Sequence, residues 1–192
     1  MRKPIYISSP KGVDYIIQDL QKYLVENLDI IELVYGKAYK NQKRNGLYVP
    51  QVYDKQNEYI EVFTEDTLGS HVFFDIAETR SAQYNGENFM SYDISVIIRL
   101  IASADLERIY PLLKHRPTEN FIVDIENVMF SYIDYHSNYA KWRFNRLIEG
   151  ANNVYKNYSF DVSDKLVDMS PYYVVAFEYN VFYNSKILNG CV

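Results

Sequence analysis

Apolar side chains recur every three or four residues in two segments, the spacing of a helix with one buried face. The first segment predicts a helix over residues 10–27, with Ser9 as its N-cap and Pro10 as its first residue. The second predicts a helix over residues 121–133, for which Thr118 is the candidate N-cap. A shorter helix is expected over residues 104–110, and Pro111 should end it.

Alternating apolar residues, or short apolar runs bounded by turn residues, predict strands elsewhere. The longest run covers residues 89–102, and the last covers residues 172–183. Further strands are expected over residues 31–35, 47–53, 59–63, 71–76 and 154–162. The strand over residues 47–53 is predicted to lie at a sheet edge, because Pro50 has no N–H for a ladder.

Three segments show neither period and are predicted to be long loops, over residues 36–46, 79–88 and 134–151. The remaining order is one helix, several strands, a helix pair and two strands. This order predicts a single α+β domain over residues 1–192, with a mainly antiparallel sheet and the N-terminal helix and central helix pair packed on one face. One core is expected to join Leu20 and Leu24 to Ile125, Val128 and Met129, beneath the strand that carries Val96 and Ile98.

Composition narrows the function classes. The net charge of −5 argues against a general nucleic-acid binder, which needs a surplus of Lys and Arg. The single cysteine, Cys191, excludes an internal disulfide, and the sequence predicts neither an export signal nor a membrane span. Twenty tyrosines fit either a strand-rich fold or a protein with extensive subunit contacts.

Candidate chemistry is sparse. His71, His115 and His136 lack metal-ligand spacing, and no nucleotide-binding or nucleophile motif occurs. Asp75, at the end of a strand, has the position of a nuclease ligand, but Asp93-Ile94-Ser95 does not supply its partners. We therefore expect no catalytic residue, no metal and no cofactor.

The segment from Lys37 to Arg44 has four cations and no acid, with tyrosines around it. It is either a solvated loop or a contact arm for DNA phosphates or a neighbouring subunit. The contact candidates are Lys37, Tyr39, Lys40, Lys43 and Arg44. Residues 58–66 are acidic and are a candidate partner for this arm, and Lys141, Arg143 and Arg146 around Trp142 form a second, weaker basic cluster.

The order of elements resembles that of tailed-bacteriophage tail terminator and related tail-completion, or head-tail joining, proteins. The resemblance rests on the leading amphipathic helix, the strand ending Leu33-Val34-Tyr35-Gly36, the long strand over residues 92–100 that leads into helices, and the closing strand over residues 174–183. It covers most of the chain and involves no short diagnostic motif.

The resemblance implies a structural virion protein, not an enzyme, that forms a homo-oligomeric ring, typically six-fold, at the phage tail or neck. Such a ring terminates the tail tube or joins it to the head, contacts other tail, neck or portal-side proteins, and lets DNA pass through its lumen without reading sequence. It is assembled in the host cytoplasm and ends in the virion, with no membrane partner. The alternative is a small cytoplasmic binding or adaptor domain without catalytic activity, and a cryptic enzyme comes third.

Overall fold

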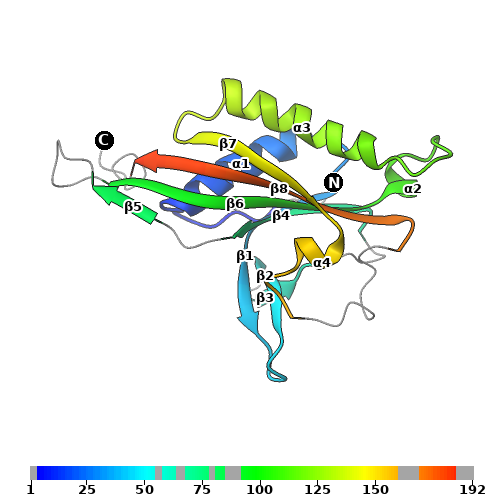
Figure 1. Ribbon diagram of the computed structural model, residues 1–192, viewed down its shortest axis with the longest axis horizontal. Helices are drawn as coiled ribbons and strands as arrows, with labels where there is room; N and C mark the ends of the chain where they lie inside the picture. The colour runs from blue at the N-terminus through cyan, green and yellow to red at the C-terminus, as the bar shows by residue number, and fades with distance from the viewer. Residues whose placement is uncertain are drawn as a thin grey trace.

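The computed structural model describes residues 4–54, 58–63, 68–77, 81–84, 92–159 and 169–184 (Figure 1). Its helices are α1 (Val13–Asn27), α2 (Leu106–Ile109), α3 (Thr118–Tyr135) and α4 (Ala151–Val154). Its strands are β1 (Leu33–Gln42), β2 (Tyr48–Asp54), β3 (Glu58–Glu61), β4 (Ser70–Ile76), β5 (Ser81–Tyr84), β6 (Tyr92–Asp105), β7 (Lys141–Glu149) and β8 (Tyr172–Asn184). The predicted α+β class is confirmed.

The described strands form one sheet in the order β3-β2-β1-β4-β6-β8-β7, and β5 pairs with the first part of β6. All neighbours run antiparallel except β1 and β4, which are parallel. The two longest strands, β6 and β8, pair from Asp93–Asn184 to Asp105–Tyr172 and lie between β4 and the edge strand β7. Both were expected from their alternating patterns.

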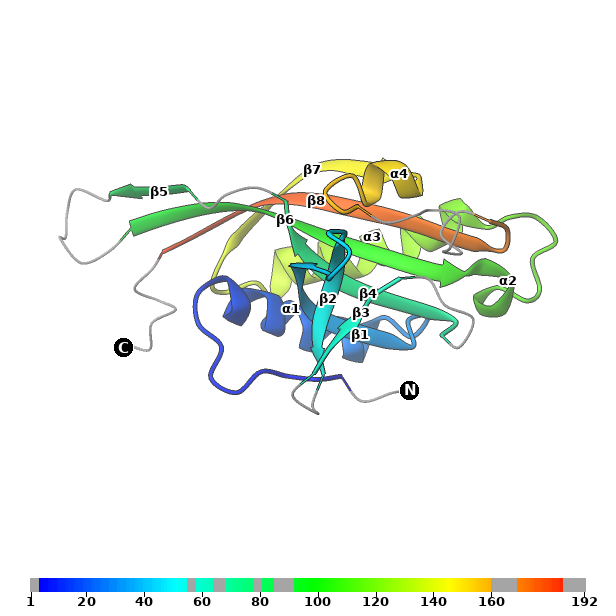
Figure 2. The same cartoon turned by 90° about the horizontal axis from the view of Figure 1, so that it is seen from below.

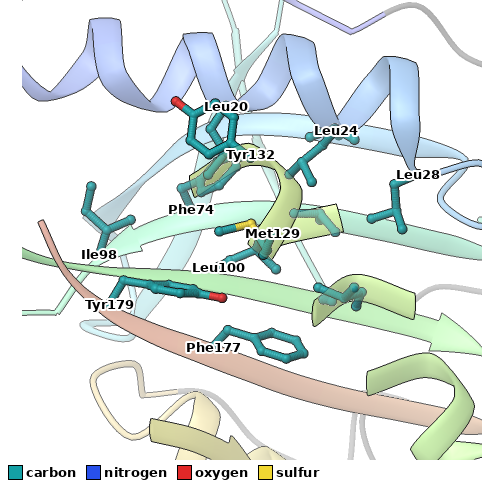
Figure 3. Close-up of a cluster of buried hydrophobic side chains, with 14 of the residues drawn as sticks. Leu20, Leu24, Leu28, Phe74, Ile98, Leu100, Met129, Tyr132, Phe177 and Tyr179 are labelled. Atoms are coloured by element: carbon teal, nitrogen blue, oxygen red, sulfur yellow. The ribbon is translucent and has the colours of Figure 1, made fainter. Parts of the chain in front are cut away.

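The main core lies between the sheet and the helices α1 and α3, as Figures 1 and 3 show. The predicted association is confirmed, since Leu20 and Leu24 of α1 and Ile125 and Met129 of α3 join one cluster with β6, and Val128 packs against it half-buried. The alternate residues of β8 that the pattern placed on one side all belong to this cluster: Tyr173, Val175, Phe177, Tyr179, Val181 and Tyr183. Burial of this apolar face is what holds both helices on the sheet.

A second, smaller core lies on the opposite face of the sheet. There Phe73, Ile101 and Val174 pack under α4 and the two tyrosines that follow it, Tyr155 and Tyr158. The strand predicted over residues 154–162 is therefore wrong as far as residue 159: α4 ends at Val154, and a turn brings both tyrosines onto the sheet. Residues 160–162 lie outside the described residues.

Three predicted loops need correction. Strand β1 does not end at Gly36 but continues to Gln42, so most of residues 36–46 is strand. Residues 79–88 include β5, and Asn85-Gly86 lies outside the described residues. Residues 134–151 include β7, whose period is hidden by a register shift between Phe144 and Arg146.

Strand β2 is not an edge strand, because it lies between β1 and β3. Pro50 is nevertheless placed where its missing N–H costs little. Val62 donates its backbone N–H to the Pro50 carbonyl at 3.1 Å, so this carbonyl points toward the β3 side. In an antiparallel ladder the backbone nitrogen of a residue points the same way as its carbonyl. The nitrogen of Pro50 therefore also faces the β3 side, where β3 has already ended at Glu61.

The helix ends also differ from the expected caps. Helix α1 begins at Val13 after Gly12, whose φ of 57° suits glycine, and Ser9 does not cap it. Thr118 is the first residue of α3, and Pro117 is in the cap position, where its side chain accepts no capping hydrogen bond. Neither α1 nor α3 nor a shorter described helix combines the length and apolar composition needed to cross a bilayer.

Candidate assembly surface

A hairpin projects from the body of the molecule on the side opposite α3 (Figures 1 and 2). We call residues 37–53 of β1 and β2 the arm. Its two strands pair antiparallel from Ala38–Val52 to Gln42–Tyr48. The tip is closed by two backbone hydrogen bonds, from the Lys43 N–H to the Leu47 carbonyl at 2.8 Å and from the Gly46 N–H to the Lys43 carbonyl at 2.9 Å. The arm is thus an ordered two-stranded ribbon, continued by β3 on one side.

All five contact candidates lie on this arm, but they differ in surroundings. Lys37 forms an ion pair with Asp14 of α1 and lies over the ring of Tyr39, 4.8 Å from its centroid. It is therefore tied to the body of the molecule. The segment contains no acid of its own, but Asp14, from a helix distant in sequence, compensates the charge of Lys37.

The tip carries the more exposed charges. Lys43 pairs with Glu61 of β3 at 2.7 Å, and Lys40 lies over the ring of Tyr48 at 4.8 Å from its centroid. Arg44 is exposed in the turn. In the described part of the chain no carboxylate forms an ion pair with Lys40 or Arg44. Glu61 belongs to the acidic segment suggested as a partner for the basic arm, and it meets the arm within one chain.

One face of the arm carries an aromatic cluster. The rings of Tyr39 and Tyr53 each contact Tyr59 of β3 edge to face, with centroids 5.6 Å and 5.8 Å away. Beside them, the Asn41 amide donates to the Gln51 side chain at 2.8 Å. These tyrosines stiffen the ribbon where it leaves the body, since aromatic pairs across strands stabilise a sheet.

Three buried charged residues, Asp75, Arg99 and Glu178, lie side by side across the sheet on the face of the second core, and the sequence pattern did not predict them. Arg99 of β6 and Glu178 of β8 are register partners, and a guanidinium nitrogen lies 2.8 Å from the Glu178 carboxylate, with side chains 3% and 2% exposed. Arg146 of β7 binds the same carboxylate at 2.9 Å. Asp75 of β4 is the register partner of Arg99 on the other side.

The pKa values of the two acids move in opposite directions. Burial acts to raise the pKa of Glu178, but hydrogen bonds from Arg146 and Arg99 outweigh it and hold that pKa below its ordinary value. Burial raises the pKa of Asp75, although Tyr158 and Arg99 oppose the shift. The sequence did contain a sign of this row, because β4, β6 and β8 each carry one charged residue, Asp75, Arg99 or Glu178, at a buried position of a mostly apolar strand.

This row does not assemble the nuclease site that the position of Asp75 suggested. Arg99 occupies the place beside Asp75, and Glu58 and Glu61 lie on β3, separated from β4 by β2 and β1. Glu65, Asp66 and Glu78 lie outside the described residues. Among the residues that are described, no three His, Cys, Asp or Glu side chains gather as a metal-binding group.

The three histidines lie apart from one another. His71 is buried in β4 between Tyr35 and Phe73, and burial lowers its pKa to about 4. His115 is exposed in the loop before α3, and His136 follows α3 and contacts Tyr23. The second basic cluster is divided: Trp142 enters the main core, Arg146 binds Glu178, and Lys141 and Arg143 are exposed.

A groove of about 790 Å³ lies at the end of the sheet where β5, β6, β8 and the start of β7 meet. Its lining is mixed, with Tyr139 and Phe182 beside Asp93, Lys141 and Asn184. Its size is within the range of small-ligand sites, but it is open along one side.

No family model matches this chain, and no curated protein sequence matches it.

Proposed function

We propose that this protein is a structural subunit of a closed ring in the tail or neck of a tailed bacteriophage, where it terminates the tail tube or joins it to the head. The observation that carries the proposal is the ordered arm that projects from a helix-covered sheet, on the side opposite the long helix α3. A subunit with complementary surfaces on opposite sides can bind the next copy through a heterologous contact, and such contacts close into a ring when the rotation permits.

The order of elements adds to this argument. Three features that carry the resemblance to tail terminator proteins have counterparts in α1, in β6 leading into α2 and α3, and in β8. The strand expected to end at Gly36 differs, because β1 continues to Gln42. Fold analogy alone is a weak guide to function, so the arm and its charges matter more. The ring would leave other surfaces for tail, neck or portal-side neighbours and a lumen for DNA.

The open groove at the end of the sheet favours a second candidate, a small binding or adaptor domain that takes a partner between β5 and β8. Such a domain needs no ring. Native mass spectrometry and negative-stain microscopy of the purified protein separate the two candidates.

The proposal expects a single closed species, with a mass that is a whole multiple of the 22.7 kDa chain and a visible central hole. A protein that stays monomeric at every concentration, with and without purified tail tubes, would rule out the ring. Binding to the ends of tail tubes, seen by microscopy, distinguishes a tail or neck ring from an unrelated oligomer.

A further inference from the structure

We infer that the arm tip of one copy docks on the outer face of α3 of the next copy, which makes the contact between subunits head to tail. This inference rests on the proposed ring and identifies the two surfaces that form it. The arm tip comprises Lys40, Lys43 and Arg44, and the α3 outer face comprises Glu119, Val123, Glu126, Phe130 and Asp134.

The α3 outer face has the composition of a contact surface. Its five residues follow one another in steps of three or four and so line one side of the helix, away from the stripe that enters the main core. Val123 is 46% exposed and Phe130 is 53% exposed, and the three carboxylates lie around them. An apolar centre with a charged rim is how protein interfaces are built.

Among the described residues, no cation forms an ion pair with the carboxylates of this face. From Thr118 to Tyr135 the helix has no Lys, Arg or His, while Glu119, Asp124, Glu126 and Asp134 are acidic. Asp124 accepts a hydrogen bond from the Tyr110 hydroxyl at 2.6 Å. Within the described ranges no ion pair reaches Glu119, Glu126 or Asp134. These carboxylates favour a cationic partner.

The arm has the opposite charge. Residues 37–53 contain four cations and no acid. Arg44 is exposed in the turn, and Lys40 is exposed near the end of β1, where its charge also acts on Asp75. Tyr48, beneath Lys40, and Leu47 give the tip apolar surface that suits Val123 and Phe130. A basic tip with a tyrosine beneath Lys40 therefore matches a helix face with carboxylates beside a phenylalanine.

Position excludes a contact between these surfaces within one subunit. Figures 1 and 2 place the arm and α3 on opposite sides of the sheet, and their buried residues belong to the two different cores. The arm tip can meet an α3 outer face only on another copy. Among possible acidic partners of the arm, a second copy is favoured, because every copy carries the matching α3 outer face. This face is therefore always present at the same concentration as the arm.

Paired charge reversals test the contact. The arm variant is Lys40→Glu with Arg44→Glu, and the helix variant is Glu119→Lys with Asp134→Lys. Each variant alone places like charges at the contact, so the concentration at half-association in sedimentation velocity should rise about tenfold or more. A mixture of the two variants should associate again, because each arm then meets a helix of opposite charge in an alternating assembly.

The matched control is Lys11→Glu with Lys156→Glu, which changes the same charge at exposed positions outside both surfaces and should leave association unchanged. Recovery in the mixture also shows that both variants are folded. If wild-type protein forms rings and the variants form them equally well, the contact is wrong and the ring stands. If each variant is impaired and the mixture is not restored, the contact is also wrong. A wild-type protein that never associates overturns both proposals. If the mixture of variants associates again but forms a species without a central hole, the contact is supported and the ring is overturned.

Discussion

His71 is an imidazole enclosed by apolar and aromatic neighbours, and its buried Nε2 has no hydrogen-bond partner in the described structure. Above pH 6.5 the ring is neutral both folded and unfolded. Below that pH His71 becomes protonated in the unfolded chain but stays neutral in the folded state, where its pKa is about 4. Stability contributed by this residue is therefore present at neutral pH and lost as pH falls through this window.

Replacing His71 with Phe should remove this dependence. We expect the free energy of unfolding of the wild type, relative to the variant, to fall by about 2 to 3 kcal/mol between pH 7 and pH 4. Urea unfolding across this range measures the difference between the two free energies of unfolding. The titration of Asp75 and of other groups cancels in this difference, because both proteins contain them. The exposed His115, replaced by Gln, is the control and should follow the wild-type curve. Parallel curves for wild type and His71→Phe would show that His71 is not protonated on unfolding.

The Arg99–Glu178 pair is the other decisive feature at this scale. Changing Arg99 to Met leaves a buried carboxylate with less compensation and should cost about 3 to 5 kcal/mol. Changing both residues to Met should be less destabilising than Arg99→Met alone. Lys43→Met, which breaks a more exposed pair with Glu61, should cost about 1 kcal/mol or less. Chemical unfolding measures all three, and equal losses for Arg99→Met and Lys43→Met would contradict this ranking.

Among the elements, α3 has one deeply buried face and one exposed face, and substitutions on the two should differ most in their effect on stability. Ile125→Ala opens a cavity beneath the sheet and should reduce the free energy of unfolding by about 2 to 5 kcal/mol. Val123→Ala, two residues away on the exposed side, should change it by no more than about 0.5 kcal/mol. Thermal and urea unfolding test the pair. Equal effects would mean that the buried and exposed faces of α3 are reversed.

The elements that the sequence predicted well are those with one buried face. α1, α3, β6 and β8 were located because burial imposes a regular period on their apolar residues. β7 was missed because the shift at Asn145 places Trp142, Phe144 and Leu147 on one side despite their irregular spacing.

The basic composition of residues 37–44 singled out this segment in the sequence, but its structure was not predicted. The end of β1 was predicted to be a loop because residues 37–42 are polar or aromatic except for Ala38 and so show no apolar alternation. Backbone pairing with β2, which supplies the buried Val49 and Val52, makes this segment a strand. The partners of its cations, Asp14 and Glu61, lie outside residues 37–46 and depend on tertiary structure. The α3 outer face was also missed, because the helix was judged by its buried stripe.

At the scale of the whole molecule, both cores share the same strands. β4, β6 and β8 direct alternate residues to opposite faces, so Phe74 joins one cluster and Phe73 the other. We therefore expect unfolding in one cooperative step, with equal calorimetric and van't Hoff enthalpies. Phe73→Ala and Ile125→Ala should each lower the same single transition temperature. Two separate calorimetric peaks would show that the cores unfold independently.

Strand β1 belongs to two ladders, since its first half pairs with β4 and its second half pairs with β2. The strand also connects to α1, because the Gln21 amide donates to the Val34 carbonyl at 2.8 Å and Lys37 pairs with Asp14. The entropy lost in ordering the arm is therefore lost during folding, before any partner arrives. A pre-organised arm of this kind needs less binding energy than a loop that must order on contact, so even a small interface at its tip can hold a neighbour.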